Sequence, residues 1–198
     1  VLLTVSKDFP ANSLPEMVKL VKANPGKYVY GSWAIGSSGQ LTMEWLKRKT
    51  GMDIGHVPYR QTTQMLTELS TGTLQIGFAD PASPLPFIQD GRIKAIAATG
   101  TKRLPQTPKV PTFGEQGYDF KPVGWFGVLA PAKTPEAIVN RLNTEIRRIH
   151  NEPDMIAKTA ALNVSPSEPN TPAQFHATIV RDLKMWQDIV KEAGITVE

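Results

Sequence analysis

The sequence contains no cysteine, and this absence excludes several kinds of protein at once. A chain of 198 residues without cysteine has no disulfide bond, no thiol nucleophile and no cysteine-ligated metal. No apolar run is long enough to span a membrane as a helix, and no signal peptide is recognisable. We therefore expect a cytosolic protein or a mature or trimmed chain. Because residues 1–5 read as a strand inside a domain, a fragment of a longer protein is expected.

A concentrated charge of one sign is also lacking. The formal net charge is +4, and the lysines and arginines are scattered along the chain. The densest groups, Lys47-Arg48-Lys49 and Arg147-Arg148, each lie within a helix pattern, which favours a solvated face over a nucleic-acid patch. We expect no nucleic-acid partner, although a mild positive field would attract anionic small molecules.

Catalytic and metal-binding motifs are missing as well. The three histidines, His56, His150 and His176, have no metal-ligand spacing, and there is no H-E-x-x-H motif. A Ser–His–Asp triad would have to combine Ser38, His56 and Asp80, but no G-x-S-x-G elbow supports it. We therefore expect no metal, no cofactor and no catalytic residue.

Strand and helix patterns alternate between residues 28 and 99, which predicts a parallel sheet with helices on both faces. Typical capping residues mark the helix beginnings: Ser13 with Glu16 three positions later, Thr62, and Ser83 followed by proline. The expected strands are 1–5, 28–30, 53–59, 74–79 and 93–99, and the expected helices are 14–23, 40–49, 63–71 and 84–90.

The last third of the chain is predicted to be almost entirely helical. After a proline-punctuated connection at 100–122, with one helical turn near 113–116, we expect a strand at 125–130 and a short strand at Val164. Amphipathic helices are predicted to start near Thr134, at Pro153 and at Thr171. Too few strands remain to cover these helices. We infer that their sheet lies upstream of Val1 or comes from a partner chain.

A glycine- and serine-rich loop joins the strand at 28–30 to the following helix. Strand, Gly/Ser loop and helix together build anion sites, because the first helical turn has free N–H groups and the positive end of the helix dipole. Gly31 and Gly36 have P-loop spacing, but Ser37 replaces the lysine that would contact outer phosphates. The loop therefore suits a smaller anion such as a carboxylate, with Ser32, Ser37 and Ser38 as further donors. The alternative is a tight turn that binds no ligand.

Two further strand ends carry polar groups, and ligands in open parallel sheets bind beyond the carboxyl ends of strands. One has Tyr59 and Thr62, and the other has Asp80 and Ser83. Asp80 either accepts a hydrogen bond from a ligand or caps the turn before Pro81. Tyr59, like Trp33 in the first loop, either lines a pocket or packs in the core.

Several short segments in fixed order point to one family, although each is weak alone. Together they resemble the Bug, or TctC-like, family of extracytoplasmic solute receptors, the binding-protein component of tripartite tricarboxylate transporters. The resemblance covers essentially the whole chain. The segments are Ala23-Asn24-Pro25-Gly26-Lys27, Tyr30-Gly31-Ser32, Gly36-Ser37-Ser38-Gly39, His56-Val57-Pro58-Tyr59, Gly91-Arg92-Ile93-Lys94-Ala95, Lys109-Val110-Pro111-Thr112, Gly124-Trp125-Phe126-Gly127, Ala130-Pro131 and Thr134-Pro135.

The resemblance implies a periplasmic, two-lobed, Venus-flytrap receptor that binds a small carboxylate (a di- or tricarboxylate, an amino acid or an aromatic acid). It implies an α/β lobe of the periplasmic-binding-protein type II kind at 1–123, and the helical C-terminal part of the other, incomplete lobe at 124–198. The implied partner is a membrane permease or a sensor kinase. The ligand-binding residues that it implies are Ser32, Ile35, Gly36, Ser37, Ser38, Asp80 and Ser83.

The chain departs from the family pattern in two respects. The family's N-terminal part, including a first-lobe loop that also holds the ligand, is absent, which would invite a homodimer or a domain swap. Trp33 is bulky where the family more often has a small residue. We expect a non-enzymatic carboxylate receptor. The alternatives are a hydrolase or transferase that uses the loop at 36–38, and a protein-interaction module that uses the helical tail.

Overall fold

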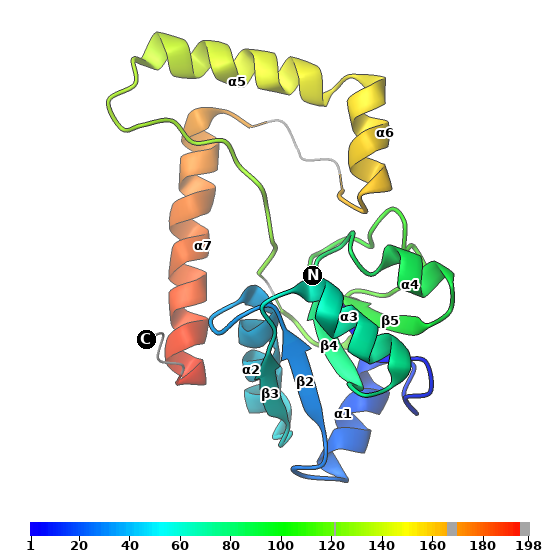
Figure 1. Ribbon diagram of the computed structural model, residues 1–198. Coiled ribbons are helices and arrows are strands. Elements are labelled where there is room, and N and C mark those ends of the chain that lie inside the picture. Colours follow the sequence, from blue (N-terminus) through cyan, green and yellow to red (C-terminus); the bar gives the residue numbers. More distant parts are fainter. Residues whose placement is uncertain (121, 166–169, 195–198) are drawn as a thin grey trace.

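A five-stranded sheet forms the centre of the molecule. The computed structural model describes residues 1–120, 122–165 and 170–194. Its strands lie in the order β3-β2-β4-β1-β5 (Figure 1). They are β1 (Leu2–Ser6), β2 (Val29–Ser32), β3 (Gly55–Pro58), β4 (Ile76–Ala79) and β5 (Ile93–Ala98).

The strand directions confirm a sheet that is mostly parallel. β2 pairs in parallel with both β3 and β4, whereas β1 lies antiparallel between β4 and β5. β5 consequently runs in the same direction as β2, β3 and β4. The strands between residues 28 and 99 are therefore parallel, as predicted from their alternation with helices, and β1 is the exception.

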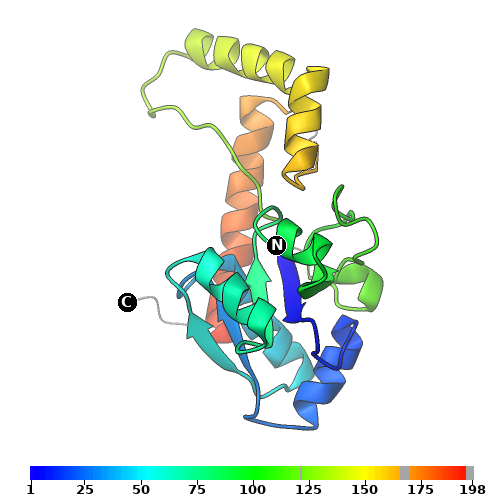
Figure 2. The same cartoon turned by 45° about the vertical axis from the view of Figure 1, so that its right-hand side comes forward.

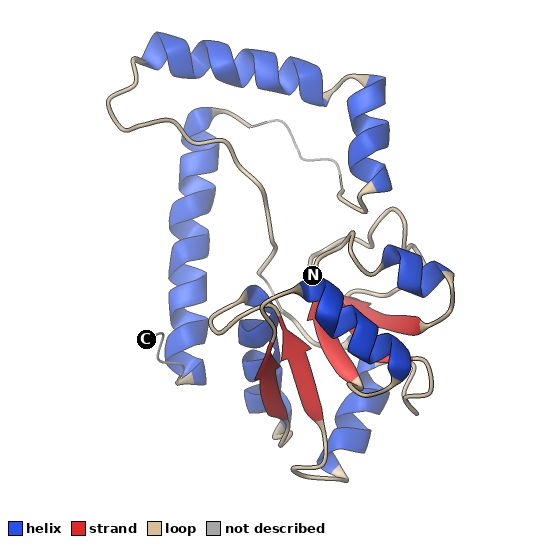
Figure 3. Cartoon of the chain, in the orientation of Figure 1, coloured by secondary structure: helices blue, strands red, loops and turns tan. Residues whose placement is uncertain are grey.

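Helices cover both faces of this sheet, as predicted. α1 (Leu14–Lys22) and α2 (Ser38–Thr50) bury their apolar sides in one core. α3 (Thr62–Thr71) and α4 (Leu85–Gln89) contribute to a second core on the other face (Figure 3). Two buried glycines allow α3 to approach closely: a Cβ on Gly31 would lie 2.9 Å from the Met65 side chain, and one on Gly77 would lie 2.9 Å from that of Leu69.

Three long helical segments follow the sheet. They are α5 (Glu136–His150), α6 (Pro153–Ala161) and α7 (Pro172–Ala193), and the predicted turn near 113–116 is the 3₁₀ helix η1 (Gly114–Gln116). Figures 1 and 2 show α5 and α6 standing away from the sheet, while the C-terminal half of α7 lies beside α2. Ile189 of α7 is buried in the same core as α2. The predicted capping box of α7 at Thr171 and Gln174 is present.

The strands predicted at 125–130 and at Val164 are wrong, because neither segment is a strand in the structure. A strand needs a partner for its backbone groups, and the described part of the chain offers none there. Trp125 instead donates from Nε1 to Asp182 Oδ2 of α7 at 2.8 Å and stacks edge-on against Phe175. Phe126 beside it is 90% exposed.

Within the described residues, α7 is the longest helix, and neither it nor any other helix has the length and apolarity needed to cross a membrane.

Candidate functional site

The three polar strand ends share one edge of the sheet. Because β2 lies between β3 and β4 and runs parallel to both, the segments that follow these strands leave from the same side. These are the β2–α2 loop (residues 33–37), the β3–α3 loop (59–61) and the β4–α4 loop (80–84). In Figure 1 this edge faces the side on which α6 lies. It is where open parallel sheets bind their ligands.

The β2–α2 loop ends in a well-formed helix N-terminus. Ser37 is the N-cap of α2, and its Oγ accepts a hydrogen bond from the N–H of Gln40 at 3.3 Å. Gly36 has a φ of 74°, which glycine adopts without strain, and its N–H donates to Gln40 Oε1 at 2.6 Å. In the described part of the chain nothing accepts from the N–H groups of Ser38 and Gly39. Ser38 is half-buried and Gly39 is buried, and their N–H groups are donors of the kind that a helix N-terminus offers to an anion.

Ser32 lies behind this loop and not on its surface. Its side chain is fully buried, and Oγ contacts Ala34 O at 3.2 Å, Ser37 Oγ at 3.0 Å and His56 Nε2 at 2.8 Å. Of the other predicted residues, Ile35 is 60% exposed, whereas Gly36, Ser37 and Ser38 are half-buried. The structure thus brings the predicted loop residues together, with Ser32 as their internal support.

Asp80 caps the turn that follows β4. Its Oδ1 accepts hydrogen bonds from the N–H groups of Ala82 and Ser83, both at 2.9 Å. Burial by itself would raise the pKa of Asp80, but the hydrogen bonds from Ser83 and Ala82 outweigh it and lower that pKa. The turn-capping alternative is thus present, and it leaves Asp80 only part of its acceptor capacity for a ligand.

Two predicted helix caps are wrong. α4 begins at Leu85 with Pro84 in the N-cap position, so Ser83 lies one residue too early and bonds the Asp80 turn instead. α3 has Gln61 as its N-cap without a side-chain bond, and Thr62 is its first residue. Before α4 the turn capped by Asp80 precedes the first helical residue, whereas before α3 the extended Gln61 takes the N-cap position, and neither is visible in capping patterns.

The two aromatic residues near the site pack against the protein. Tyr59 is buried in the core beneath α3 and donates from its hydroxyl to Glu68. Burial and this bond raise its pKa. Trp33 is partly buried against the other core. Core packing was the predicted alternative to pocket lining for both residues.

Sequence analysis missed the role of His56. Its ring stacks on Tyr30 with centroids 4.8 Å apart, and the Tyr30 hydroxyl donates to Glu44 Oε1 at 3.0 Å. Burial lowers the pKa of His56, an effect that Glu44 opposes and Lys47 reinforces. The sequence does not show that the pairing of β2 with β3 sets Tyr30 opposite His56. This register places His56 beside the strand that leads into the loop.

Asn163, which follows α6, was also missed. It is fully buried and has a φ of 57°. Its side chain donates to Pro81 O at 3.0 Å and to Thr107 Oγ1 at 3.3 Å, and it accepts from the N–H of Gln106 at 2.8 Å. An asparagine just after a helix pattern indicates the left-handed conformation. Nothing in the sequence indicates its hydrogen-bond partners, which lie 56 to 82 residues away.

The residues of the hypothetical triad are not assembled. His56 contacts Ser32 and not Ser38, and Asp80 binds the backbone of its own turn. In the described part of the chain no group of three or more histidine or acidic residues could hold a metal.

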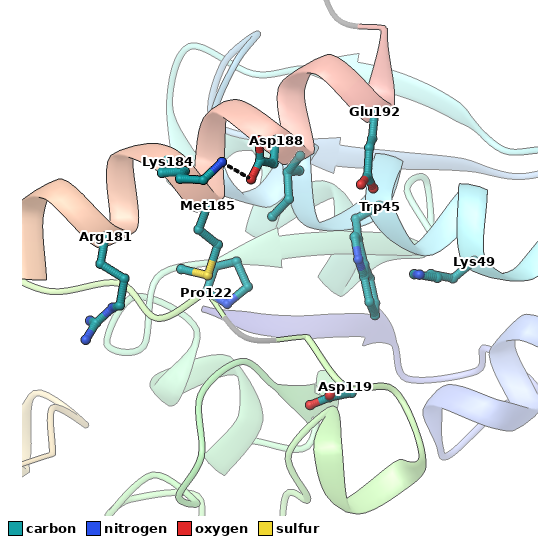
Figure 4. A pocket seen from close by; sticks show the side chains of 10 residues that line it. Trp45, Lys49, Asp119, Pro122, Arg181, Lys184, Met185, Asp188 and Glu192 are labelled. Carbon is teal, nitrogen blue, oxygen red and sulfur yellow. Dashed lines mark hydrogen bonds and ion pairs between the residues drawn. The ribbon is translucent and has the colours of Figure 1, made fainter.

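A cavity of about 400 Å³ lies elsewhere, between α2 and α7 (Figure 4). None of the predicted site residues lines it. Its lining side chains carry both signs of charge. Lys49, Lys184 and Arg181 are basic, Glu192 and Asp188 are acidic, and Lys184 forms an ion pair with Asp188. We assign no ligand to this open, mixed-charge surface.

Comparison with known proteins places the chain among solute receptors. The model of the tripartite tricarboxylate transporter family receptor matches residues 1–195. A UPF0065 protein of Bordetella pertussis is 34% identical over 197 residues, which are 98% of this chain and 60% of that protein. The chain therefore spans about 60% of the length of this protein and of other curated relatives.

Solved structures agree in fold. The Rpa4515 protein of R. palustris, solved with adipate, is 30% identical with a TM-score of 0.87, and the match covers 98% of this chain and 65% of that one. MatC from Rhodopseudomonas palustris, with bound malate, is 26% identical with a TM-score of 0.81, over 96% and 65% of the two chains. The chain belongs to the tripartite tricarboxylate transporter receptor family.

Proposed function

We propose that this protein is a periplasmic solute-binding protein that captures a small carboxylate for a tripartite tricarboxylate transporter. The observation that carries this proposal is the pair of free N–H groups, Ser38 and Gly39, at the start of α2. Both residues belong to the first turn of α2, which follows the sheet edge where three parallel strands end. Two N–H groups at the positive end of a helix dipole suit a carboxylate.

The ligand class is supported from two directions. The loop has no lysine for outer phosphates at position 37, and two relatives of the same fold were solved with the dicarboxylates adipate and malate. We propose that Ile35, Gly36 and Ser38 contact the acid at the surface of the loop. Asp80 and Ser83 would form the opposite side from the β4–α4 loop.

We propose two lobes, with the boundary near residue 123. Residues 1–120 contain the five-stranded sheet and nearly all of both cores. The helices that follow leave apolar side chains exposed along one side of α5, namely Ile138, Leu142, Ile146 and Ile149. In this proposal residues 124–198 belong to a second lobe, and closure of the two lobes buries the ligand.

The partner that we propose is the membrane permease of the transporter, because the family is defined as its receptor component. The same family membership supports a periplasmic location. The comparisons do not favour a sensor kinase or a homodimer, and we propose neither. The family is one of receptors and not of enzymes, so the enzyme alternative has no support either.

Calorimetric titration of the wild-type protein with a panel of acids tests the proposal. The panel contains adipate, malate, citrate, aspartate and benzoate, with the corresponding amides or alcohols as uncharged controls. We expect at least one acid to bind with a defined stoichiometry and its uncharged analogue to be silent. Absence of binding by every acid, in a sample shown by circular dichroism to be folded, would remove the receptor proposal.

A variant pair locates the binding site. Ser38→Pro removes one of the two free N–H groups at a helix position that tolerates proline, whereas Ser38→Ala keeps the N–H and removes only the hydroxyl. We expect binding to weaken strongly in Ser38→Pro and less in Ser38→Ala. Equal affinity in all three proteins would place the acid elsewhere.

A further inference from the structure

The side chain of His56 is the link between the edge strand β3 and the β2–α2 loop. Its Nε2 lies 2.8 Å from Ser32 Oγ, a fully buried atom with two other polar neighbours. Those neighbours, Ala34 O and Ser37 Oγ, lie near the two ends of the loop. Ser32 thus receives contacts from the loop on one side and from His56 on the other.

Counting protons gives each of these contacts a direction. A serine hydroxyl donates once and accepts up to twice. Ala34 O only accepts, so the single proton of Ser32 goes to it. Ser37 Oγ and His56 Nε2 must then both donate to Ser32 Oγ. This is the arrangement that satisfies all three contacts, and it requires the proton of the neutral imidazole to be on Nε2.

The ring is held in place from α2. Tyr30 stacks on one face of His56, and its hydroxyl is fixed by Glu44, which also pairs with Lys47 at 2.9 Å. Side chains locked by packing and by further hydrogen bonds position a site more sharply than loop residues do alone. The chain of contacts therefore runs from α2 through Tyr30 and His56 to Ser32.

We propose that His56 is a positioning residue for the carboxylate-binding loop. By donating from Nε2–H to Ser32 Oγ, it holds Ser32 against Ala34 and Ser37 and so fixes the loop that leads into the first turn of α2. Its effect on a ligand rests on the function proposed above, whereas its effect on the loop does not.

This arrangement also sorts the serines by role. Both hydroxyl protons of Ser32 and Ser37 are used inside the loop, and Ser37 Oγ additionally accepts from Gln40 N–H. Neither side chain has a proton left for an acid. Among these serines, Ser38 at the start of α2 is then the one whose hydroxyl is outside this network, and the ligand is held by it and by backbone N–H groups.

Two substitutions separate the donor from the ring. His56→Phe keeps an aromatic ring against Tyr30 but removes the N–H. His56→Gln removes the ring but retains an amide donor of similar reach. His176→Phe, at an exposed position on α7, controls for replacing a histidine in general.

The first readouts need no ligand. Amide hydrogen exchange at Gly36, Ser37 and Gln40 should be faster in His56→Phe by roughly two- to tenfold, the value of one ordinary hydrogen bond. It should be close to wild type in His56→Gln and in His176→Phe. Nitrogen-15 spectra of the imidazole should show the proton of His56 on Nε2.

Unchanged exchange in His56→Phe, equally fast exchange in His56→Gln, or a proton on Nδ1 of the wild-type ring would each overturn the proposal. Titration with adipate and malate then separates the positioning role of His56 from the receptor function. Both proposals stand if the wild type binds an acid and His56→Phe binds it more weakly. The factor by which affinity falls should equal the factor by which the exchange rate of the loop amides rises. If the wild type binds neither these acids nor the rest of the panel, the receptor function fails, and the exchange and tautomer results still decide the role of His56.

Discussion

At the scale of single residues, the acceptors and donors at the sheet edge are largely used by the protein itself. Ser32 serves its own loop, and Asp80 serves its own turn. What remains for a ligand is therefore determined by which hydrogen bonds are already made. Backbone N–H groups and the Ser38 hydroxyl remain at the first loop, whereas the Asp80 carboxylate at the third already accepts from Ala82 and Ser83.

The turn after β4 gives a direct test of this interpretation. Asp80→Ala removes the acceptor of two backbone N–H groups, so we expect the free energy of unfolding to fall by about 1 kcal/mol, because water replaces part of the loss at this half-buried position. Asp80→Asn keeps an oxygen at Oδ1 and should lose less. Urea denaturation at pH 7 measures both, and an Asp80→Ala protein as stable as wild type would contradict the capping role.

The lowered pKa of Asp80 also fixes a direction for the effect of pH. A carboxyl group whose pKa is lower in the folded than in the unfolded protein stabilises the fold above its ordinary pKa of 3.8. That stabilisation is lost as the pH falls through the lowered value. We expect the stability difference between wild type and Asp80→Asn to shrink as the pH falls from about 5 to below 3.8. Unfolding curves across this range test it, and a difference that grows on acidification would reverse the assigned sign.

At the scale of the elements, the position of α2 against the sheet depends on Gly39. A Cβ at Gly39 would lie 2.8 Å from Phe78 Cβ and 3.1 Å from the Trp33 ring. Alanine has a higher helix propensity than glycine, by about 1 kcal/mol, but overpacking costs about 1–3 kcal/mol. We expect Gly39→Ala to destabilise the protein and to shift the start of α2 away from β4.

The matched control for this substitution is Gly124→Ala, where an added Cβ would meet no other atom within 4 Å. Thermal unfolding of the two variants measures the difference. If Gly39→Ala were more stable than the wild type, helix propensity would outweigh packing at this position, and the close approach of α2 to β4 would not be needed.

Much of the element order could be predicted from the sequence, because helix faces and strand alternation are local patterns. The parallel strands, the helices on both faces, the Ser13 N-cap of α1 and the capping box of α7 are confirmed. The antiparallel direction of β1 could not be predicted in this way, since it depends on strands more than seventy residues distant. The predicted strand at 125–130 failed for a related reason: β propensity reflects packing against neighbours, and the described chain supplies no neighbour there.

The candidate site was predictable to a similar extent. The loop after β2 was located correctly, because glycines and serines between a strand and a helix have a local signature. The supports of the loop were not, because His56 and Ser32 are 24 residues apart and meet only through the pairing of β2 with β3. Whether the predicted residues bind an acid stays a prediction.

At the scale of the whole molecule, few contacts fix the C-terminal helices relative to the sheet. α7 packs on α2, with Ile189 in the core, and Asn163 joins the end of α6 to the loops near Pro81 and Gln106. Asn163 is the buried polar residue through which the helical part reaches the turn of Asp80. A substitution at Asn163 should therefore affect both the end of α6 and the loops near Pro81 and Gln106.

Replacing Asn163 by glycine isolates this junction. Glycine accepts the φ of 57° without strain, so Asn163→Gly removes the side-chain bonds to Pro81, Gln106 and Thr107 and leaves the backbone conformation allowed. We expect a loss of about 1–3 kcal/mol in the free energy of unfolding, because three hydrogen bonds are lost, of which the one to Thr107 is buried and those to Gln106 and Pro81 are part-buried. Asn163→Ala should lose about 1 kcal/mol more, because its Cβ is strained in the left-handed region.

Hydrogen exchange distinguishes this junction from a general weakening of the fold. In Asn163→Gly the amide of Gln106 should lose protection, while amides of β2 and β4 in the centre of the sheet should change only by the global loss of stability. If Gln106 stays as protected as in the wild type, the three hydrogen bonds do not hold the helices to the sheet edge. The placement of α6 near the Asp80 turn would then depend on other contacts, such as the packing of α7 against α2 and of Phe120 against Trp186.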